Sequence, residues 1–216
     1  MIRLIRNCAI ELHFDPAGLE TLVDSFGRLL REGHASLTMG LDEGGLFQDR
    51  ATGTSEVSVS LSILPEDPTS YFERSPSGYT WHLSREDSDY LLSQFVDCKN
   101  TAGFFPSETI YIDGFGPMNE RTGKGEMLYG FYNIPTDRAV RLQVQSSPDW
   151  TLYRIQLEQG LFGMATREPG VKLFVKGDTD EEVLARLREE TRRTSRNPYF
   201  KELFRKQKAT TKRPAP

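Results

Sequence analysis

Three histidines and two cysteines are the residues of this 216-residue chain best suited to metal or nucleophilic chemistry. His13, His34 and His82 form no His-x-x-x-His pair that could hold a metal on one helix face. His13 and His34 flank one strand–helix–strand pattern, so a small hydrolase-like enzyme with a composite site remains an alternative. Cys8 and Cys98 lack the spacing of a metal or redox motif, which favours two buried thiols.

Two short motifs resemble catalytic signatures and fail at their flanking positions. Thr122-Gly123-Lys124-Gly125 is similar to a phosphate-binding loop, but Met118 stands where the upstream glycine belongs and Gly125 where the magnesium-binding Ser or Thr belongs. Ser77 lacks the flanking glycines of a nucleophile elbow. We therefore expect no catalytic residues, no cofactor and no metal, and we regard an enzyme as the less favoured interpretation.

Charge is divided unevenly along the chain. Residues 1–180 contain 16 Lys and Arg against 26 Asp and Glu, a net charge of −10, whereas residues 181–216 contain 11 against 5, a net charge of +6. Such fields affect association partners and rates. The acidic body favours a cationic partner. The basic end, with Tyr199 and Phe200 available for base stacking, leaves a nucleic-acid-associated protein as a second alternative.

The beginning of the chain does not resemble a secretory signal. Arg6, Asn7 and Glu11 interrupt any apolar run, and no stretch of about 18 apolar residues follows. We expect a cytoplasmic protein with no membrane contact.

The clearest structural pattern lies in the first forty residues. Residues 8–14 alternate between apolar and polar side chains, as in a strand with one buried face. Asp15-Pro16 is typical of a helix start, and leucines and phenylalanines then recur at three- and four-residue spacing. Gly33 should end this helix, and residues 35–39 resume the strand pattern. The helix over residues 16–32 should therefore cover a sheet.

Later segments extend this pattern to an α+β fold. Strands are predicted at residues 57–63, 79–83, 110–112, 127–132, 139–144, 150–157 and 171–175, and helices after Ser84, Thr179 and Asn197. We expect a mixed, largely antiparallel sheet of about seven or eight strands with two helices packed on it, and no internal repeats. The expected parts are an acidic domain over residues 1–176, a helical appendage over 177–205 and a basic disordered tail over 206–216.

The opening sequence Glu11-Leu-His-Phe-Asp-Pro-Ala-Gly-Leu-Glu-Thr-Leu, its helix and the Gly33-His34-Ala35 return resemble the start of some immunity proteins of bacterial polymorphic toxin systems. Trp81-His-Leu-Ser-Arg-Glu-Asp and the helix after it are similar. The resemblance lies mainly in residues 8–40 and 81–96. It implies a non-catalytic cytosolic protein that binds one cognate toxin and neutralises it.

Acidic loops are the expected contact surface for such a toxin. A toxin that attacks nucleic acid, such as a nuclease, commonly has a cationic cleft, which acidic side chains would complement. Exposed aromatic side chains would anchor the contact. The predicted partner-binding residues are Asp42, Glu43, Asp49, Glu66, Asp67, Glu73, Phe47, Tyr71 and Phe72. The alternative for each is an ordinary solvated loop residue.

Overall fold

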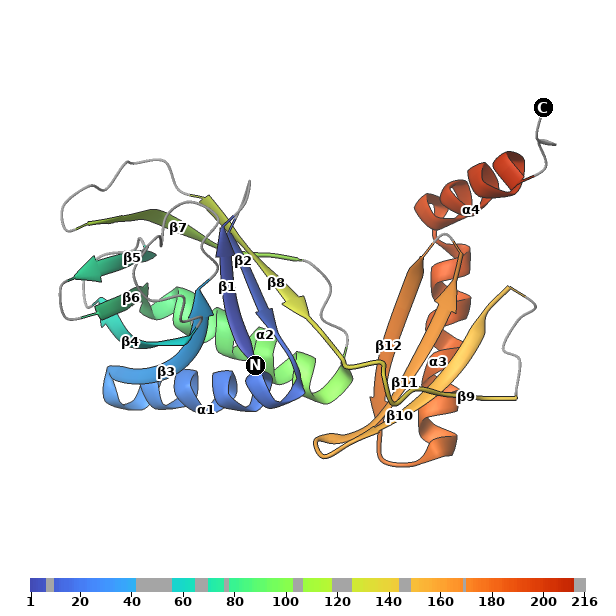
Figure 1. Ribbon diagram of the computed structural model, residues 1–216, viewed down its shortest axis with the longest axis horizontal. Helices are drawn as coiled ribbons and strands as arrows, with labels where there is room; N and C mark the ends of the chain where they lie inside the picture. Colours follow the sequence, from blue (N-terminus) through green and yellow to red (C-terminus); the bar gives the residue numbers. More distant parts are fainter. Residues whose placement is uncertain are drawn as a thin grey trace. The chain divides into compact units, whose positions relative to one another are not determined.

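The computed structural model describes residues 1–6, 10–41, 56–64, 70–75, 78–102, 107–117, 126–143, 149–168 and 170–211. The chain forms two compact units. The barrel unit comprises Met1–Asn100 and Phe104–Ile134, and the second unit comprises Thr101–Gly103 and Pro135–Pro216. Each unit has its own sheet and its own hydrophobic core (Figure 1).

The barrel unit is a closed ring of strands with two helices. Its elements are β1 (Ile2–Arg6), β2 (Ile10–Phe14), α1 (Pro16–Glu32), β3 (His34–Leu41), β4 (Glu56–Leu64), β5 (Ser70–Ser75), β6 (Gly78–Ser84), α2 (Arg85–Thr101), β7 (Ser107–Pro117) and β8 (Glu126–Tyr132). The strands close in the order β1-β2-β8-β7-β5-β6-β4-β3. This sheet mixes parallel and antiparallel pairs, and antiparallel pairs predominate over the described strands as a whole. The predicted α+β class is confirmed.

The ring consists of two copies of one ββαββ unit. The first copy is β1, β2, α1, β3 and β4, and the second is β5, β6, α2, β7 and β8. Exchanging the two sets leaves the order of the ring unchanged, and the parallel pairs β1–β3 and β2–β8 become β5–β7 and β6–β4. Both helices have 17 residues. The repeat is one of strand order and helix position, and the expectation of no internal repeats concerned the sequence, which this order does not test.

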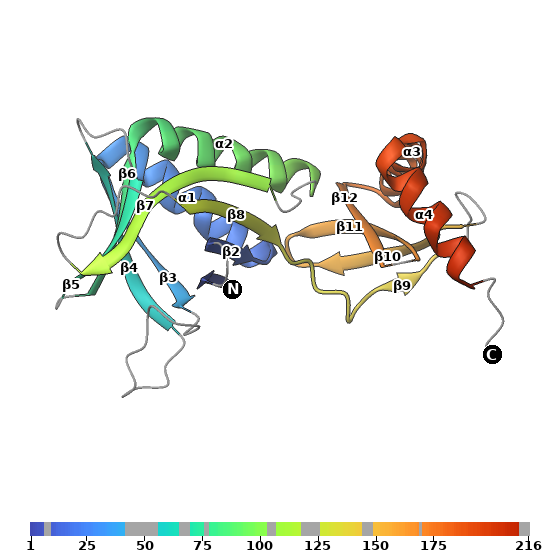
Figure 2. The same cartoon turned by 90° about the horizontal axis from the view of Figure 1, so that it is seen from above.

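The core lies on one face of this curled sheet. Buried apolar residues alternate with more exposed ones along β2 and β4. The apolar side chains of α1 and α2 belong to the same core as the buried side chains of these strands. Phe26 of α1 makes edge contacts with Phe95 of α2 and with Trp81 of β6, at centroid distances of 5.3 and 5.9 Å. Phe14 of β2 contacts Phe95 at 5.6 Å. Each helix thus packs on a strand of the other copy, and the helices lie side by side (Figure 2).

Side-chain capping explains where the two helices begin. The Asp15 carboxylate accepts a hydrogen bond from the Gly18 N–H at 2.8 Å, and Pro16 takes the first helical position. Gly33 ends α1 in the left-handed region at φ 80°, so both predicted ends of this helix are confirmed. The predicted cap of α2 is also confirmed, because Ser84 Oγ accepts from the Asp87 N–H at 3.0 Å.

The second unit is an antiparallel sheet with a helical end. Its elements are β9 (Val140–Arg141), β10 (Thr151–Leu157), β11 (Gly160–Arg167), β12 (Val171–Gly177), α3 (Asp180–Arg196) and α4 (Pro198–Thr211). The sheet has the order β12-β11-β10-β9. Strand β11 was not predicted, because residues 161–165 are all buried and show no alternation. The helix α3 is capped by Thr179, whose Oγ1 accepts from the Glu182 N–H, as predicted.

The units divide the chain at a different place from the expected domains. The expected boundary after Lys176 falls before the last residue of β12, and β12 and α3 both belong to the second unit. Val183 and Leu187 of α3 are buried in the same core as Val175 of β12, so the helix completes this sheet. Residues 206–211, expected in a disordered tail, belong to α4. No described helix combines the length and the apolar composition needed to cross a membrane.

Candidate functional site

The structure describes three of the nine predicted partner-binding residues. The other six, Asp42, Glu43, Phe47, Asp49, Glu66 and Asp67, lie outside the described residues. The prolines on either side of this segment predicted a loop. Tyr71, Phe72 and Glu73 lie instead in strand β5. Phe72 is only 2 % exposed and belongs to the barrel core, so its prediction as an exposed anchor was wrong.

The ends of strand β4 show where the two acidic segments leave the sheet. Residues 42–55 connect Leu41 to Glu56, and residues 65–69 connect Leu64 to Ser70. Glu56 and Leu64 are the two ends of β4, so they lie about 26 Å apart at about 3.3 Å per residue. The acidic segments therefore leave from opposite ends of this strand. A single compact contact surface would include one of the two segments and not both.

His82 forms a polar cluster with two predicted contact residues. Its ring stacks on Tyr71 at a centroid distance of 4.4 Å, and its Nε2 lies 2.8 Å from a carboxylate oxygen of Glu73. Tyr71 and His82 are direct neighbours across β5 and β6. All three side chains are partly exposed, so the cluster lies on the sheet face opposite the core. Glu73 is thus engaged by His82, which lowers its availability to a partner.

His13 occupies the position in the first copy that His82 occupies in the second. Each histidine lies two residues before the cap of the following helix, Asp15 for α1 and Ser84 for α2. His13 Nε2 lies 2.8 Å from a Glu11 carboxylate oxygen, and its ring stacks on Phe131 at 4.5 Å. Each histidine therefore contacts a carboxylate and an aromatic ring, but the ring that stacks on His13 belongs to β8 of the second copy.

The composite site between His13 and His34 does not form. His13 pairs across the sheet with Arg3, which in turn pairs with Gly40 of β3. His34 stands six residues before Gly40, about 20 Å away along β3. Its Nδ1 lies 3.1 Å from the carbonyl oxygen of Glu32 at the end of α1. The two histidines therefore cannot act on one substrate atom.

Cys98 is buried within the barrel core, as predicted, whereas Cys8 lies outside the described residues. Residues 118–125, with the sequence similar to a phosphate-binding loop, and Ser77 also lie outside them. Burial raises the pKa of the Tyr132 phenol, and the electrostatic effects of the nearby Cys98, Asp15 and Glu20 raise it further. Tyr132 is consequently a neutral hydrogen-bonding group at ordinary pH.

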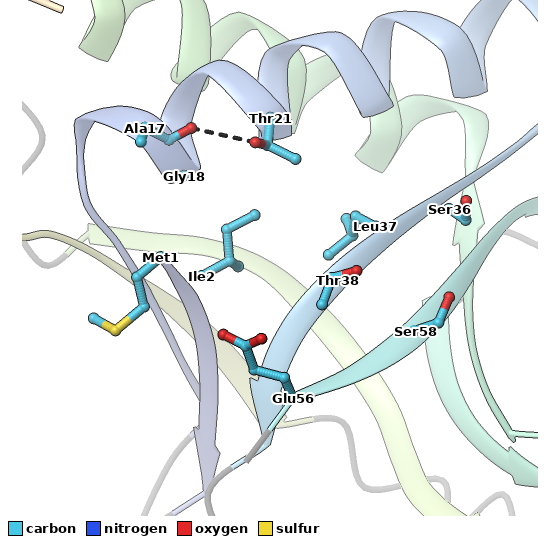
Figure 3. Close-up of a pocket in the computed structure, with 10 residues that line it drawn as sticks. All are labelled: Met1, Ile2, Ala17, Gly18, Thr21, Ser36, Leu37, Thr38, Glu56 and Ser58. Carbon is cyan, nitrogen blue, oxygen red and sulfur yellow. Dashed lines mark hydrogen bonds between the residues drawn. The ribbon is translucent and has the colours of Figure 1, made fainter. Parts of the chain in front are cut away.

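A pocket of about 520 Å³ opens between α1, β1, β3 and β4 (Figure 3). Strand β3 makes seven residue pairs with β4 but pairs with β1 only at Gly40 and Leu41. The sheet is therefore open between β1 and the first part of β3, and α1 lies beside that opening. Sequence analysis missed this pocket, because no local pattern shows where two strands separate.

The pocket is rich in hydrogen-bond acceptors. Hydroxyl groups come from Thr21, Ser36, Thr38 and Ser58, and among the described residues of its wall Glu56 is the only carboxylate. In Figure 3 the Glu56 carboxylate extends from β4 toward Ile2 and Thr38. Ile2 and Leu37 add apolar surface. This volume lies in the range of small-molecule sites, which usually combine apolar walls with a few polar groups.

Within the described residues, no group of three or more His, Cys, Asp or Glu side chains has the arrangement of a metal site. Comparison with protein-family models, with curated proteins and with solved structures finds no match for this chain.

Proposed function

We propose that this protein is a non-catalytic binding protein of the toxin-immunity kind, which neutralises a cationic protein toxin through its barrel unit. One observation carries this proposal: the charge division follows the two structural units. The barrel unit contains 20 acidic and 10 basic residues, a net charge of −10, and the second unit contains 11 acidic and 17 basic residues, a net charge of +6. A separate acidic body would attract a cationic cleft and exclude other partners.

The contact surface is proposed at the end of the barrel where β3 leads into β4. Asp42, Glu43 and Asp49 lie in the segment between these strands, and Glu56 begins β4. Together they place four carboxylates within fifteen residues of sequence. Glu66 and Asp67 belong to the segment at the other end of β4, and Glu73 is paired with His82. We therefore rank the first segment above these residues as the toxin contact.

The sequence resemblance to immunity proteins supports the same function, in addition to the charge division. Its two stretches, residues 8–40 and 81–96, contain the strand–helix junctions of the two copies. The second stretch is thus the structural counterpart of the first, and not an independent similarity.

The full-length chain, used as bait in lysate of its source organism, tests this function. We expect one stoichiometric protein to be retained, its association rate to fall with rising salt, and co-expression of the chain to relieve that protein's toxicity. A variant with Asp42→Asn, Glu43→Gln and Asp49→Asn should associate more slowly. Its control, Glu86→Gln, Asp89→Asn and Asp97→Asn on exposed positions of α2, changes the net charge equally. Equal effects of both triple variants would reject the proposed surface, and retention of no protein would reject the function.

A nucleic-acid role through the basic end has weaker support. The helix α3 contains five basic and five acidic residues, so it has no net charge. Within it, Arg192 pairs with Glu189 and Arg193 with Glu190. Most of the excess lies in residues 197–216, with six basic residues against one acidic residue. Tyr199, 71 % exposed, is the aromatic side chain available there for stacking. Retention of nucleic acid alone by the bait, lost steeply with salt, would favour this alternative.

A further inference from the structure

We propose that the pocket between α1 and β3 binds an organic cation, a primary ammonium or guanidinium group on a short apolar stem. The group belongs to a free small molecule or to a Lys or Arg side chain of a protein partner, and the chemistry of recognition is the same. In the second case the inference rests on the proposed function and specifies its contact. In the first case it is independent of that function.

The backbone edge of β3 supplies the first set of acceptors. The Ser36 carbonyl points toward α1, because it accepts a hydrogen bond from Ser25 Oγ at 3.5 Å. Backbone groups two residues apart in a strand point the same way, so the Thr38 carbonyl also faces the opening. With the hydroxyl groups of Thr38 and Ser58, these carbonyls favour a ligand that carries several N–H donors.

Charge selects a cation over a neutral donor. Glu56 is the only acidic side chain that the described part of the pocket wall contains, and the barrel unit has a net charge of −10. The N-terminal end of a helix favours anions, and α1 begins beside the pocket. That preference is already met within the chain, because the Asp15 carboxylate accepts the Gly18 N–H at 2.8 Å. The N-terminal ammonium of Met1, which also lines the pocket, pairs with the same Asp15 carboxylate at 2.6 Å. Among the described residues of the pocket wall, the unmatched charge is therefore that of Glu56.

The two copies differ in the side chains that stand at the pocket positions of their helices. Ala17, Gly18 and Thr21 of α1 correspond to Glu86, Asp87 and Tyr90 of α2, as the two caps align. In the second copy, the fully buried Ser70 donates to the Asp87 carboxylate and accepts from the Ser84 N–H at 3.1 Å. Larger, paired side chains thus stand where the first copy has small ones. Within the described residues, the helix of the first copy therefore carries the smaller side chains at these three positions.

Amide chemical shifts of the ¹⁵N-labelled full-length chain test the proposal with agmatine as the probe and 1-hexanol as the neutral control. We expect agmatine to shift the amides of Thr21, Thr38 and Ser58 with a Kd of about 0.1 to 1 mM. Glu56→Gln should weaken binding about fivefold, as expected for an exposed ion pair. Thr21→Tyr, which introduces the residue of the second copy at an exposed position, should abolish binding. The matched control Glu86→Gln should leave it unchanged.

The same variants distinguish the two sources of the cation. Loss of the toxin partner from Thr21→Tyr bait assigns the pocket to a partner side chain, whereas retention of the partner with loss of agmatine assigns it to a free ligand. Equal shifts with 1-hexanol, shifts elsewhere, or affinities unchanged in both Glu56→Gln and Thr21→Tyr would overturn the proposal. These outcomes leave the bait experiment with the unaltered chain as a separate test of the toxin-binding function.

Discussion

Gly18 and Asp87 hold the same position in two equivalent helices. The Gly18 N–H donates to Asp15 Oδ1 at 2.8 Å, and the Asp87 N–H donates to Ser84 Oγ at 3.0 Å. A Cβ on Gly18 would lie 2.3 Å from the Met1 carbonyl oxygen, so the first copy cannot carry the carboxylate of the second. The close approach of Met1 thus explains why this helix begins with small residues.

Gly18→Ala should destabilise the barrel unit by about 1 to 3 kcal/mol, because the added methyl group meets backbone atoms that cannot rotate away. Gly27→Ala in the same helix is the control. Its Cβ would meet only the end of the flexible Arg31 side chain at 3.3 Å, so it should stabilise the helix by up to about 1 kcal/mol. Urea unfolding followed by Trp81 fluorescence, in a Trp150→Phe background, measures both. Equal destabilisation by the two substitutions would contradict the contact with Met1.

Local signals in the sequence were sufficient for elements that have a cap and one buried face. The helix α1 was predicted with its observed ends, since Asp15-Pro16 and Gly33 each have a specific backbone role. Strand β5 was missed because the six-residue segment lies between prolines, and β11 because both of its faces are buried. In each case the pairing partners, and not the segment itself, determine the structure.

The functional surface was less predictable than the fold for a related reason. Phe72 and Tyr71 are adjacent aromatic residues, yet alternation in β5 places one in the core and the other on the outer face. The pocket depends on the separation of β1 from β3, which lie in different parts of the sequence. The net charge of each part of the chain, in contrast, is a sum over its residues, so the uneven division of charge was visible from the sequence.

Gly163→Ala should destabilise the second unit by about 1 to 3 kcal/mol. A Cβ on Gly163 would lie 2.5 Å from Val183 Cγ1 and 2.8 Å from Leu187 Cδ1, because α3 packs directly on this point of β11. Val183→Ala removes the closest of these atoms and should relieve part of the clash. The double variant should therefore be more stable than the sum of the two single effects predicts, by about 0.5 kcal/mol or more. Hydrogen exchange of the β11 amides measures these changes, and additive effects would contradict this packing.

Arg167→Lys should loosen α4 without unfolding the sheet. The Arg167 guanidinium lies 3.7 Å from the centroid of the Phe204 ring and donates to Asp149 at 2.9 Å. Lysine keeps the charge but loses the planar group that stacks on the ring. We expect the free energy of local opening of α4 to fall by about 1 kcal/mol in hydrogen exchange, with α3 unchanged. Arg205→Lys, at an exposed pair with Glu202, should have no effect, and equal loss from both variants would exclude the stacking role.

Tyr132 should make the barrel unit sensitive to alkaline pH. Burial raises the pKa of its phenol above the value of about 10 expected in the unfolded chain. Below pH 10 the phenol is neutral in both states. Above pH 10 the unfolded chain releases this proton while the folded chain retains it, so the unfolded state is favoured by up to about 1 kcal/mol per pH unit. Urea unfolding between pH 9 and about 11 should show a steeper loss of stability for the unaltered chain than for Tyr132→Phe. Identical slopes would show that the phenol ionises equally well in the folded barrel.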